Sequence, residues 1–238
     1  MYPLTFVLGN QNQINMSKNS THQIPCPSCG HTGEFTRWDS INVDLDPDMR
    51  EKAKCGAIFT WTCPHCGETF TVPYATLYHD MKRNLMIYYL PTRPEDGKGL
   101  SISSFKHHFS LNPEYTYRCT YEIEDFMEKI AQLESGLDDR VIELLKMVMT
   151  GKNHPKDLPE NAELRFVAAV PDNGGEPKTL MFRCVTGKEN NSKDQKVMMV
   201  PFEVYKDLDK EPMARKMFEQ EAEFPEVSQA FLRRLLGK

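Results

Sequence analysis

The chain has 238 residues, of which 39% are hydrophobic and 26% are charged, and its formal net charge is −5. This composition is typical of a globular protein with a core, and it excludes a low-complexity or wholly disordered chain. The negative charge argues against a partner whose binding depends on neutralising phosphate groups.

The start of the chain lacks the features of an export signal. Residues 2–8 are too short for the apolar core of a signal peptide, no basic residue precedes them, and no small-residue cleavage site follows. No segment has the 18 or so consecutive apolar residues that a membrane span needs. We therefore expect a cytoplasmic protein with reduced cysteines. Residues 1–23 are expected to be an extension outside the domains, with disorder as one alternative.

The motif C-P-x-C-G occurs twice, as Cys26-Pro-Ser-Cys29-Gly and as Cys63-Pro-His-Cys66-Gly. Two thiolates three residues apart can face one metal ion from a single turn, and the glycine that follows permits a positive φ. Two such turns match tetrahedral zinc and leave no open position for water. We therefore predict a structural zinc ion at Cys26, Cys29, Cys63 and Cys66, with iron as the alternative. Cys55 is expected to be a buried thiol that does not bind the metal.

The segments around the two motifs predict a zinc-ribbon module with an inserted short helix. Residues 35–43 have the composition of a strand. Asp46 is expected to be the N-cap of a helix that ends at Gly56. Residues 57–62 and 68–74 are predicted as two strands, which places the second motif at the tip of a hairpin.

The chain resembles the CpXC family of bacterial proteins. The resemblance covers about residues 24–150 and rests on the paired C-P-x-C-G motifs, on Leu77-Tyr78-His79-Asp80, on a strand at 86–91, and on Gly136-Leu137-Asp138-Asp139-Arg140 before a helix. It implies a bacterial protein with a metal-binding N-terminal part. It implies no particular activity.

The region after the second motif predicts strands at 84–90 and 115–121, a long loop at 92–113, and helices at 123–135 and 138–149. Because only a short turn at Gly136 separates the two helices, we expect them to form an antiparallel hairpin. The polar, proline-containing residues 151–161 are expected to divide the chain into domains at 24–150 and 162–238.

The C-terminal domain is predicted to be an antiparallel β-meander with covering helices. Leu164, Phe166, Ala168 and Val170 alternate with other residues, which indicates a half-buried strand. The other predicted elements are a turn at 171–175, strands at 179–185 and 197–205, and helices at 208–218 and 227–236. The predicted fold class of the whole chain is therefore α+β.

The favoured function is that of a structural-zinc module that binds another protein as a scaffold. The alternative is a zinc-ribbon nucleic-acid-binding or transcription-related protein. For that alternative the module offers a few cations and one aromatic residue, namely Arg37, Trp38, Arg50, Lys52 and Lys54. Nucleic-acid-binding surfaces are normally basic, so this set favours the protein partner.

An enzyme with His79 in its site is the second alternative. His79 and Asp80 are adjacent, so on a strand they point to opposite faces and cannot form a dyad with each other. His79 would instead need Asp44 or Asp46. His107 and His108 lie in the predicted loop without an identified partner. The sequence contains no P-loop, nucleophile elbow, dinucleotide-binding turn or H-E-x-x-H helix.

Overall fold

A computed structural model describes residues 17–94, 99–101, 111–151, 162–186 and 196–237. The chain forms two compact units. The N-terminal unit extends to Met127 and also includes Gln220–Glu226, whereas the C-terminal unit consists of Glu128–Glu219 and Val227–Lys238. The division falls inside helix α3, Ile123–Glu134, and not at residues 151–161 as the sequence suggested. The second half of α3 belongs to the C-terminal unit because it contacts α4, as in the ion pair between Glu128 and Lys146 at 2.6 Å. The composition of the loops does not reveal such contacts.

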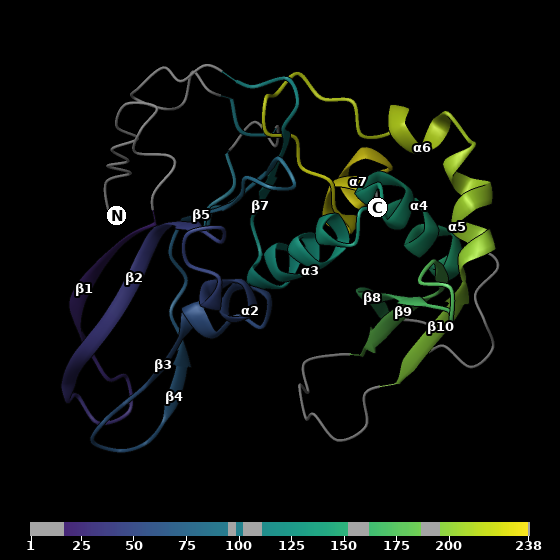
Figure 1. Ribbon diagram of the computed structural model, residues 1–238. Coiled ribbons are helices and arrows are strands. Elements are labelled where there is room, and N and C mark those ends of the chain that lie inside the picture. Colours follow the sequence, from purple (N-terminus) through teal and green to yellow (C-terminus); the bar gives the residue numbers. More distant parts are fainter. Residues whose placement is uncertain (1–16, 95–98, 102–110, 152–161, 187–195, 238) are drawn as a thin grey trace. The chain divides into compact units, whose positions relative to one another are not determined.

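The N-terminal unit is built on a five-stranded mixed sheet with the order β1-β2-β5-β6-β7 (Figure 1). Its strands are β1 Lys18–Pro25, β2 Thr32–Asn42, β5 Thr76–Asp80, β6 Leu85–Tyr89 and β7 Thr116–Thr120. The pairs β2–β5 and β6–β7 are parallel, and the pairs β1–β2 and β5–β6 are antiparallel. Strands were predicted where β2, β6 and β7 lie, but β1, β5 and the assembly of the five strands into one sheet were not predicted.

Strand β1 corrects the expected extension at 1–23, because residues 18–23 pair with β2. Most side chains of β1 are exposed on both faces, so the strand lacks the alternation that reveals a half-buried strand. Its backbone pairing with β2 nevertheless makes it the first arm of a long hairpin. Residues 1–16 lie outside the described part of the chain.

Helix α2, Asp48–Lys54, is the predicted inserted helix, but its N-cap is Pro47 and not Asp46. The Asp46 carbonyl accepts a hydrogen bond from the amide of Met49 at 3.0 Å, so a tight turn precedes the helix. The predicted strand at 57–62 begins as a 3-10 turn, η1 Ala57–Phe59, and only Thr60–Thr62 forms strand β3. Gly56 precedes this turn with a φ of 75°, a conformation that favours glycine.

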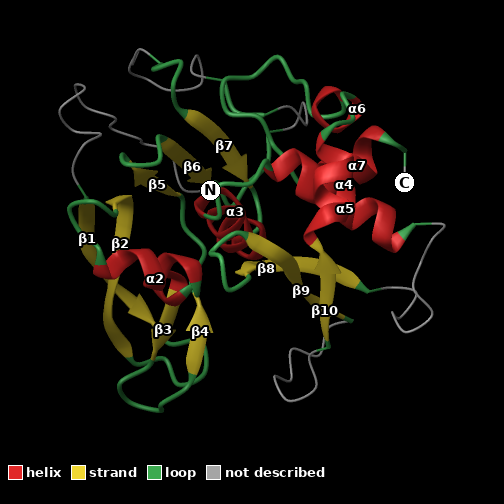
Figure 2. Ribbon diagram, turned by 45° about the vertical axis from the view of Figure 1, so that its right-hand side comes forward, coloured by secondary structure: helices red, strands yellow, loops and turns green. Residues whose placement is uncertain are grey.

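Strand β3 pairs with β4, Thr69–Thr71, to form a second hairpin. This short strand replaces the longer one predicted at 68–74. The two hairpins, β1–β2 and β3–β4, lie side by side in Figures 1 and 2. The indole Nε1 of Trp61 on β3 donates to the carbonyl of Glu34 on β2 at 2.9 Å, which joins them.

Both faces of the five-stranded sheet contribute to the core. On one face, Tyr78 and Tyr89 contact Phe126 at the start of α3, and Phe126 also contacts Phe59. The other face carries a second cluster of buried residues: Ala75, Leu77, Met86, Tyr88, Leu90, Leu100, Tyr117, Cys119, Tyr121 and Phe224. Burial on both faces explains why β5 and β6 show no alternation in their sequences.

The C-terminal unit contains the predicted three-stranded antiparallel meander, with the order β10-β9-β8. Its elements after α3 are α4 Asp139–Thr150, β8 Glu163–Pro171, β9 Pro177–Val185, β10 Val197–Pro201, α5 Phe202–Asp209, α6 Met213–Lys216 and α7 Gln229–Leu235. The strand predicted to reach residue 205 ends at Pro201, where α5 begins. Proline has no amide hydrogen for a ladder and suits the first turn of a helix, which explains this earlier end.

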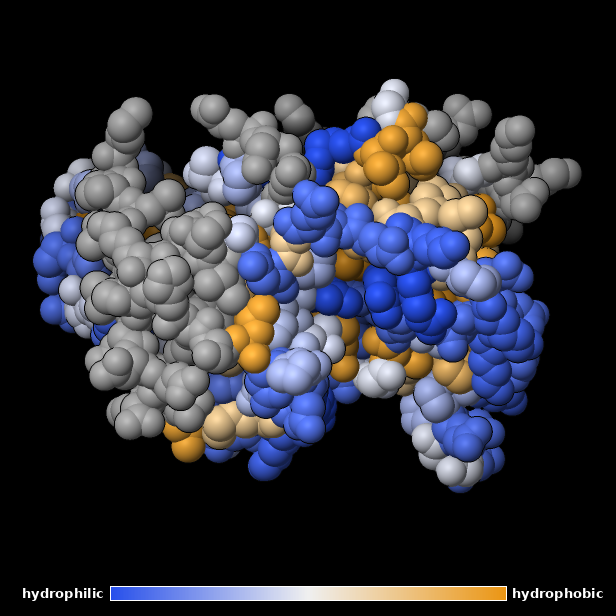
Figure 3. Space-filling view, turned by 90° about the horizontal axis from the view of Figure 1, so that it is seen from above, coloured by the Kyte–Doolittle hydropathy of each residue, from blue (hydrophilic) through white to orange (hydrophobic). Residues whose placement is uncertain are grey.

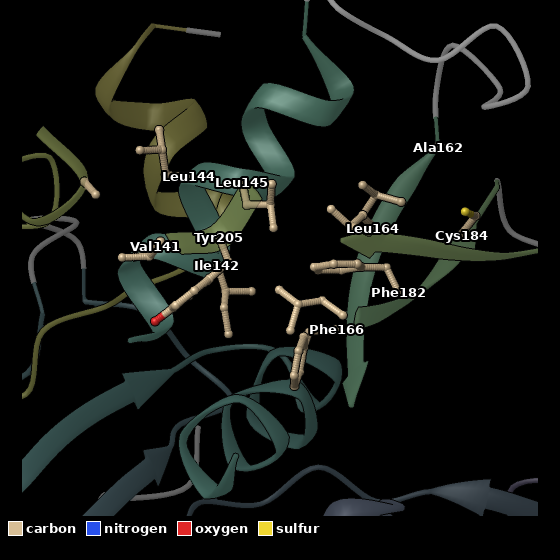
Figure 4. Close-up of a cluster of buried hydrophobic side chains, with 13 residues drawn as sticks. Val141, Ile142, Leu144, Leu145, Ala162, Leu164, Phe166, Phe182, Cys184 and Tyr205 are labelled. Carbon is tan, nitrogen blue, oxygen red and sulfur yellow. The ribbon is translucent and has the colours of Figure 1, made fainter. Parts of the chain in front are cut away.

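Helix α4 packs its apolar side against the meander (Figure 4). Its residues Val141, Ile142 and Leu145 are fully buried, and they share a core with Leu164 and Phe182 of the sheet. A β-bulge between Phe166 and Ala168 breaks the alternation predicted for β8. Val167 is exposed, as the alternation predicted, but after the bulge Ala169 packs against the core in place of Ala168 and Val170.

Hydrophilic residues cover much of the surface in Figure 3, and hydrophobic residues show between them in small areas. Exposed large apolar side chains come from several elements, including Val197 and Met199 on β10 and Leu235 on α7. Over the described ranges, no helix combines the length and apolar character required to cross a lipid bilayer.

Candidate metal centre

The two C-P-x-C-G motifs are the tips of the two hairpins of the N-terminal unit. The first lies between β1 and β2, and the second lies between β3 and β4. The backbone of each tip follows the same pattern. The amide of Cys26 donates to the carbonyl of His31 at 2.8 Å, and the amide of Cys63 donates to that of Glu68 at 2.8 Å. Equivalent hydrogen bonds therefore shape both turns in the same way.

A glycine completes each turn. The amide of Gly30 donates to the carbonyl of Cys26 at 2.9 Å, and the amide of Gly67 donates to that of Cys63 at 3.0 Å. Their φ angles are 73° and 75°, which alanine and larger residues adopt only with strain. The glycines of the motif thus have the conformational role that the sequence predicted.

The turns bring all four predicted cysteines together, and their Sγ atoms lie within 4.8 Å of one another. Across the two hairpins, Cys26 Sγ is 3.6 Å from Cys66 Sγ, and Cys29 Sγ is 3.7 Å from Cys63 Sγ. In a tetrahedral site with Zn–S bonds of about 2.3 Å, two sulfur atoms lie about 3.8 Å apart. These two distances are close to that value, so the cluster could hold a single metal ion, and all four cysteines are free of disulfides.

Close packing between the hairpins holds the two turns in place. Gly33 on β2 lies so near Trp61 that a Cβ atom there would come within 2.9 Å of the indole ring. The same Cβ would be 3.1 Å from Pro64 in the second motif. The rings of His31 and His65 stack with their centroids 5.0 Å apart. Gly33 and Trp61 were not predicted as part of the site, because no local motif marks a contact between hairpins.

The electrostatics of the four thiols favour a bound cation. Burial raises the pKa of Cys63, but hydrogen bonds from the amides of Cys66 and His65 and from the thiols of Cys66 and Cys26 together outweigh this effect and lower the pKa to about 6. The amide of Glu68 lowers the pKa of Cys66, whereas burial and the three other cysteines raise it to about 12. Four adjacent thiolates repel one another, so without a cation the cluster resists full deprotonation. A divalent ion removes that penalty and displaces the protons.

The remaining cysteines lie outside this cluster. Cys55 is exposed and not buried as predicted, and its thiol donates to the carbonyl of Lys52 at 3.7 Å. It follows a helix end at the surface, which its apolar sequence neighbours did not reveal. Cys119 and Cys184 are buried.

His79 is buried on β5, and its Nε2 lies 3.2 Å from the hydroxyl of Tyr115. Asp80 is paired elsewhere, with Arg50 Nη1 at 2.7 Å and Arg83 Nη1 at 2.8 Å. Asp44 accepts hydrogen bonds from the amides of Met81 and Lys82. His107 and His108 lie outside the described residues.

Fold and site thus define an α+β protein with a four-cysteine cluster that can hold a metal ion. The family model described as CpXC protein matches residues 24–146, which is more than half of the 238 residues. The chain belongs to the CpXC family. No curated protein and no solved structure matches it.

Proposed function

We propose that Cys26, Cys29, Cys63 and Cys66 bind one structural zinc ion in a zinc-ribbon module, and that the unit it stabilises is a scaffold for a protein partner. The observation that carries the zinc site is the pair of sulfur–sulfur distances between the hairpins, 3.6 and 3.7 Å. These distances are close to those of a zinc ion with four thiolate ligands. Because protein ligands fill every position, the ion acts on the fold and not as a catalyst.

The hairpins give the metal a clear structural task. Strands β3 and β4 expose most of their side chains, and Trp61 is their one buried residue. Such a thin apolar contact contributes little to stability, so small modules of this kind depend on metal binding for folding. Zinc bound to two sulfur atoms of each hairpin would link the two tips.

A substitution series tests this role of the metal. Cys29→Ser and Cys66→Ser each remove one sulfur ligand, and Cys55→Ser changes an exposed cysteine outside the cluster. We expect both ligand variants to hold less than one equivalent of zinc and to melt at a lower temperature than the wild type. The Cys55→Ser variant should match the wild type in both measurements. Equal zinc content in all three variants would contradict the proposed ligand set.

The distribution of charge supports a protein partner over nucleic acid. Three cations considered for nucleic-acid binding have carboxylate partners: Arg37 with Asp39 at 3.1 Å, Arg50 with Asp80 at 2.7 Å, and Lys54 with Glu51 at 3.5 Å. These pairs reduce the attraction for phosphate groups, which normally supplies much of nucleic-acid affinity.

Affinity purification distinguishes the two partners. The zinc-loaded full chain is used as bait in a bacterial lysate, and the Cys66→Ser variant is used in parallel. We expect the wild type, and not the variant, to retain one protein that is insensitive to nuclease. Co-purified nucleic acid, lost after nuclease treatment and at higher salt, would favour the alternative function.

The buried position of His79 supports a structural role for this side chain. Its ring lies within the sheet and contacts Tyr115, with centroids 5.6 Å apart. We therefore propose no reaction at His79.

A further inference from the structure

The strand at the edge of the N-terminal sheet, β7, is covered by a short segment from far along the chain. This segment, Gln220–Glu226, is named the return segment, because both its neighbours belong to the C-terminal unit. The carbonyl of Pro225 accepts a hydrogen bond from the amide of Cys119 on β7 at 3.2 Å. Phe224 and Leu100 exchange two backbone hydrogen bonds, at 2.9 and 3.0 Å. The return segment is therefore held by backbone hydrogen bonds at two isolated β-bridges, Leu100–Phe224 and Cys119–Glu226, in the manner of a short added strand.

An aromatic side chain anchors the return segment. Phe224 is 2% exposed, and its ring lies 5.0 Å from that of Tyr117 and 6.5 Å from that of Tyr88. Gly99 lets the two backbones come this close, because a Cβ atom there would be 2.5 Å from the carbonyl oxygen of Phe224. The surface under Phe224 is thus shaped for a bulky ring on an extended chain.

A buried ion pair is the second anchor. Glu226 is 1% exposed, and its carboxylate accepts from Arg93 Nη2 at 3.0 Å. The guanidinium of Arg93 lies over the ring of Tyr121, 4.5 Å from its centroid. A buried carboxylate with one fixed arginine selects strongly for charge, since an unpaired charge is costly to bury. Together the contacts specify an aromatic residue and, two positions later, a carboxylate.

We propose that the surface formed by Arg93, Gly99, Leu100, Tyr117 and Cys119, here named the β7 groove, is a peptide-binding site. Its partner is a protein with an extended segment in which one residue separates an aromatic side chain from a carboxylate, and this segment displaces the return segment. This inference rests on the proposed scaffold function and gives the scaffold its binding surface. The occupant seen in the structure defines the chemistry of the partner, because strand addition uses backbone bonds for affinity and side-chain pockets for specificity.

The tethered return segment competes with a partner for the β7 groove and so lowers the measured affinity of that partner. A tethered segment acts at an effective concentration of about 1 mM, so a free peptide of the same sequence binds the wild type only weakly. Any change that weakens the tethered segment alone should therefore raise the affinity of a free peptide that fits the changed groove.

An exchange of charge between groove and peptide tests this competition in the full chain. The probe is a labelled peptide with the sequence of residues 219–228, made in its native form and with Glu226→Lys. In Arg93→Glu protein the tethered Glu226 faces a like charge and is repelled. We expect the lysine peptide to bind this variant at least tenfold more tightly than it binds the wild type, measured by fluorescence anisotropy. The native peptide should not bind the variant.

The matched control is Lys52→Glu, which makes the same change of charge at an exposed residue of the N-terminal unit. Equal binding of the lysine peptide to both variants would show a general charge effect and overturn the proposal. A failure of the lysine peptide to bind folded Arg93→Glu protein would also overturn the proposal. Zinc content is measured on each sample, so that loss of the metal site and failure of the peptide site give different results.

Hydrogen exchange of the wild type decides the matter even if Arg93→Glu protein does not fold. A displaceable segment must open without unfolding the sheet. We expect the amides of Phe224 and Leu100 to exchange at least tenfold faster than those of Ile87 and Tyr88 in the central strand β6. Equal protection of all four amides would mean that the return segment is a fixed part of the core, and it would overturn the proposal.

Discussion

At the scale of single residues, Gly67 shows how one conformation supports the metal site. Its φ is 75°, and a Cβ atom there would meet nothing within 4 Å. Gly67→Ala should therefore add backbone strain alone and lower the free energy of unfolding by about 1 kcal/mol. Gly67→Asn should cost less, because asparagine visits this conformation more readily. Chemical denaturation of the zinc-loaded protein checks both, and an equal loss for the two variants would contradict this explanation.

Asp80 is a residue whose importance the sequence did not reveal. Its carboxylate is fully buried, and burial raises its pKa, but hydrogen bonds from Arg50 and Arg83 outweigh this and lower the pKa below the ordinary value. The charged form is therefore the one that stabilises the fold. The stabilisation is complete above the ordinary pKa of about 3.9 and is lost as the pH falls through the lower pKa of the folded state.

Asp80→Asn should accordingly lower the free energy of unfolding by about 2–3 kcal/mol at pH 7, because it removes charge-assisted hydrogen bonds to two arginines. Urea denaturation at several pH values measures the effect. The difference from the wild type should shrink only under acid conditions, below about pH 4. A difference that stays constant down to pH 2 would mean that the charge of Asp80 has no part in it.

At the scale of elements, the buried charges between α3, α4 and β8 hold the C-terminal unit together. Lys146 Nζ lies 2.6 Å from Glu128 Oε1 and 3.0 Å from Glu143 Oε1. Glu128 also accepts the backbone amide of Phe166 on β8 at 2.7 Å. Burial opposes the charge of Lys146, yet Glu128 and Glu143 raise its pKa, so the group is charged at neutral pH.

Removal of Lys146 should take away the closest counter-charge of two buried carboxylates. Among the described residues, these keep only Arg165 at 3.2 Å from Glu128 and Lys129 at 4.0 Å from Glu143. Lys146→Met is expected to lower the free energy of unfolding by about 3–5 kcal/mol. The control is Lys206→Met, which removes an exposed pair with Glu203 and should cost less than about 1 kcal/mol. Equal losses in thermal or chemical denaturation would show that the buried network adds no more than a surface pair.

The same elements show which features of the fold local sequence can predict. Apolar spacing was sufficient to predict α4, and alternation was sufficient to predict β9, because each element buries one face. The β-bulge at Val167 was missed, since one extra residue reverses the faces without changing the composition. Strand β1 was missed because its stability comes from pairing with β2 and not from an apolar face.

At the scale of the whole molecule, the units do not follow the order of the chain. The family match ends at residue 146, but the N-terminal unit ends at Met127 and takes in Gln220–Glu226. Sequence patterns are local, so they predicted the four cysteines from two motifs. They contained no signal for the parallel pairs β2–β5 and β6–β7 or for the return segment, which join residues distant in sequence.

The central claim is that one zinc ion bound by four sulfur atoms joins the two hairpins of the N-terminal unit. X-ray absorption at the zinc edge of the purified full chain tests it most directly, with the metal content measured on the same sample. We predict one equivalent of zinc and a first shell of four sulfur atoms at about 2.3 Å. A nitrogen or oxygen atom in that shell, iron in place of zinc, or metal well below one equivalent would contradict the claim.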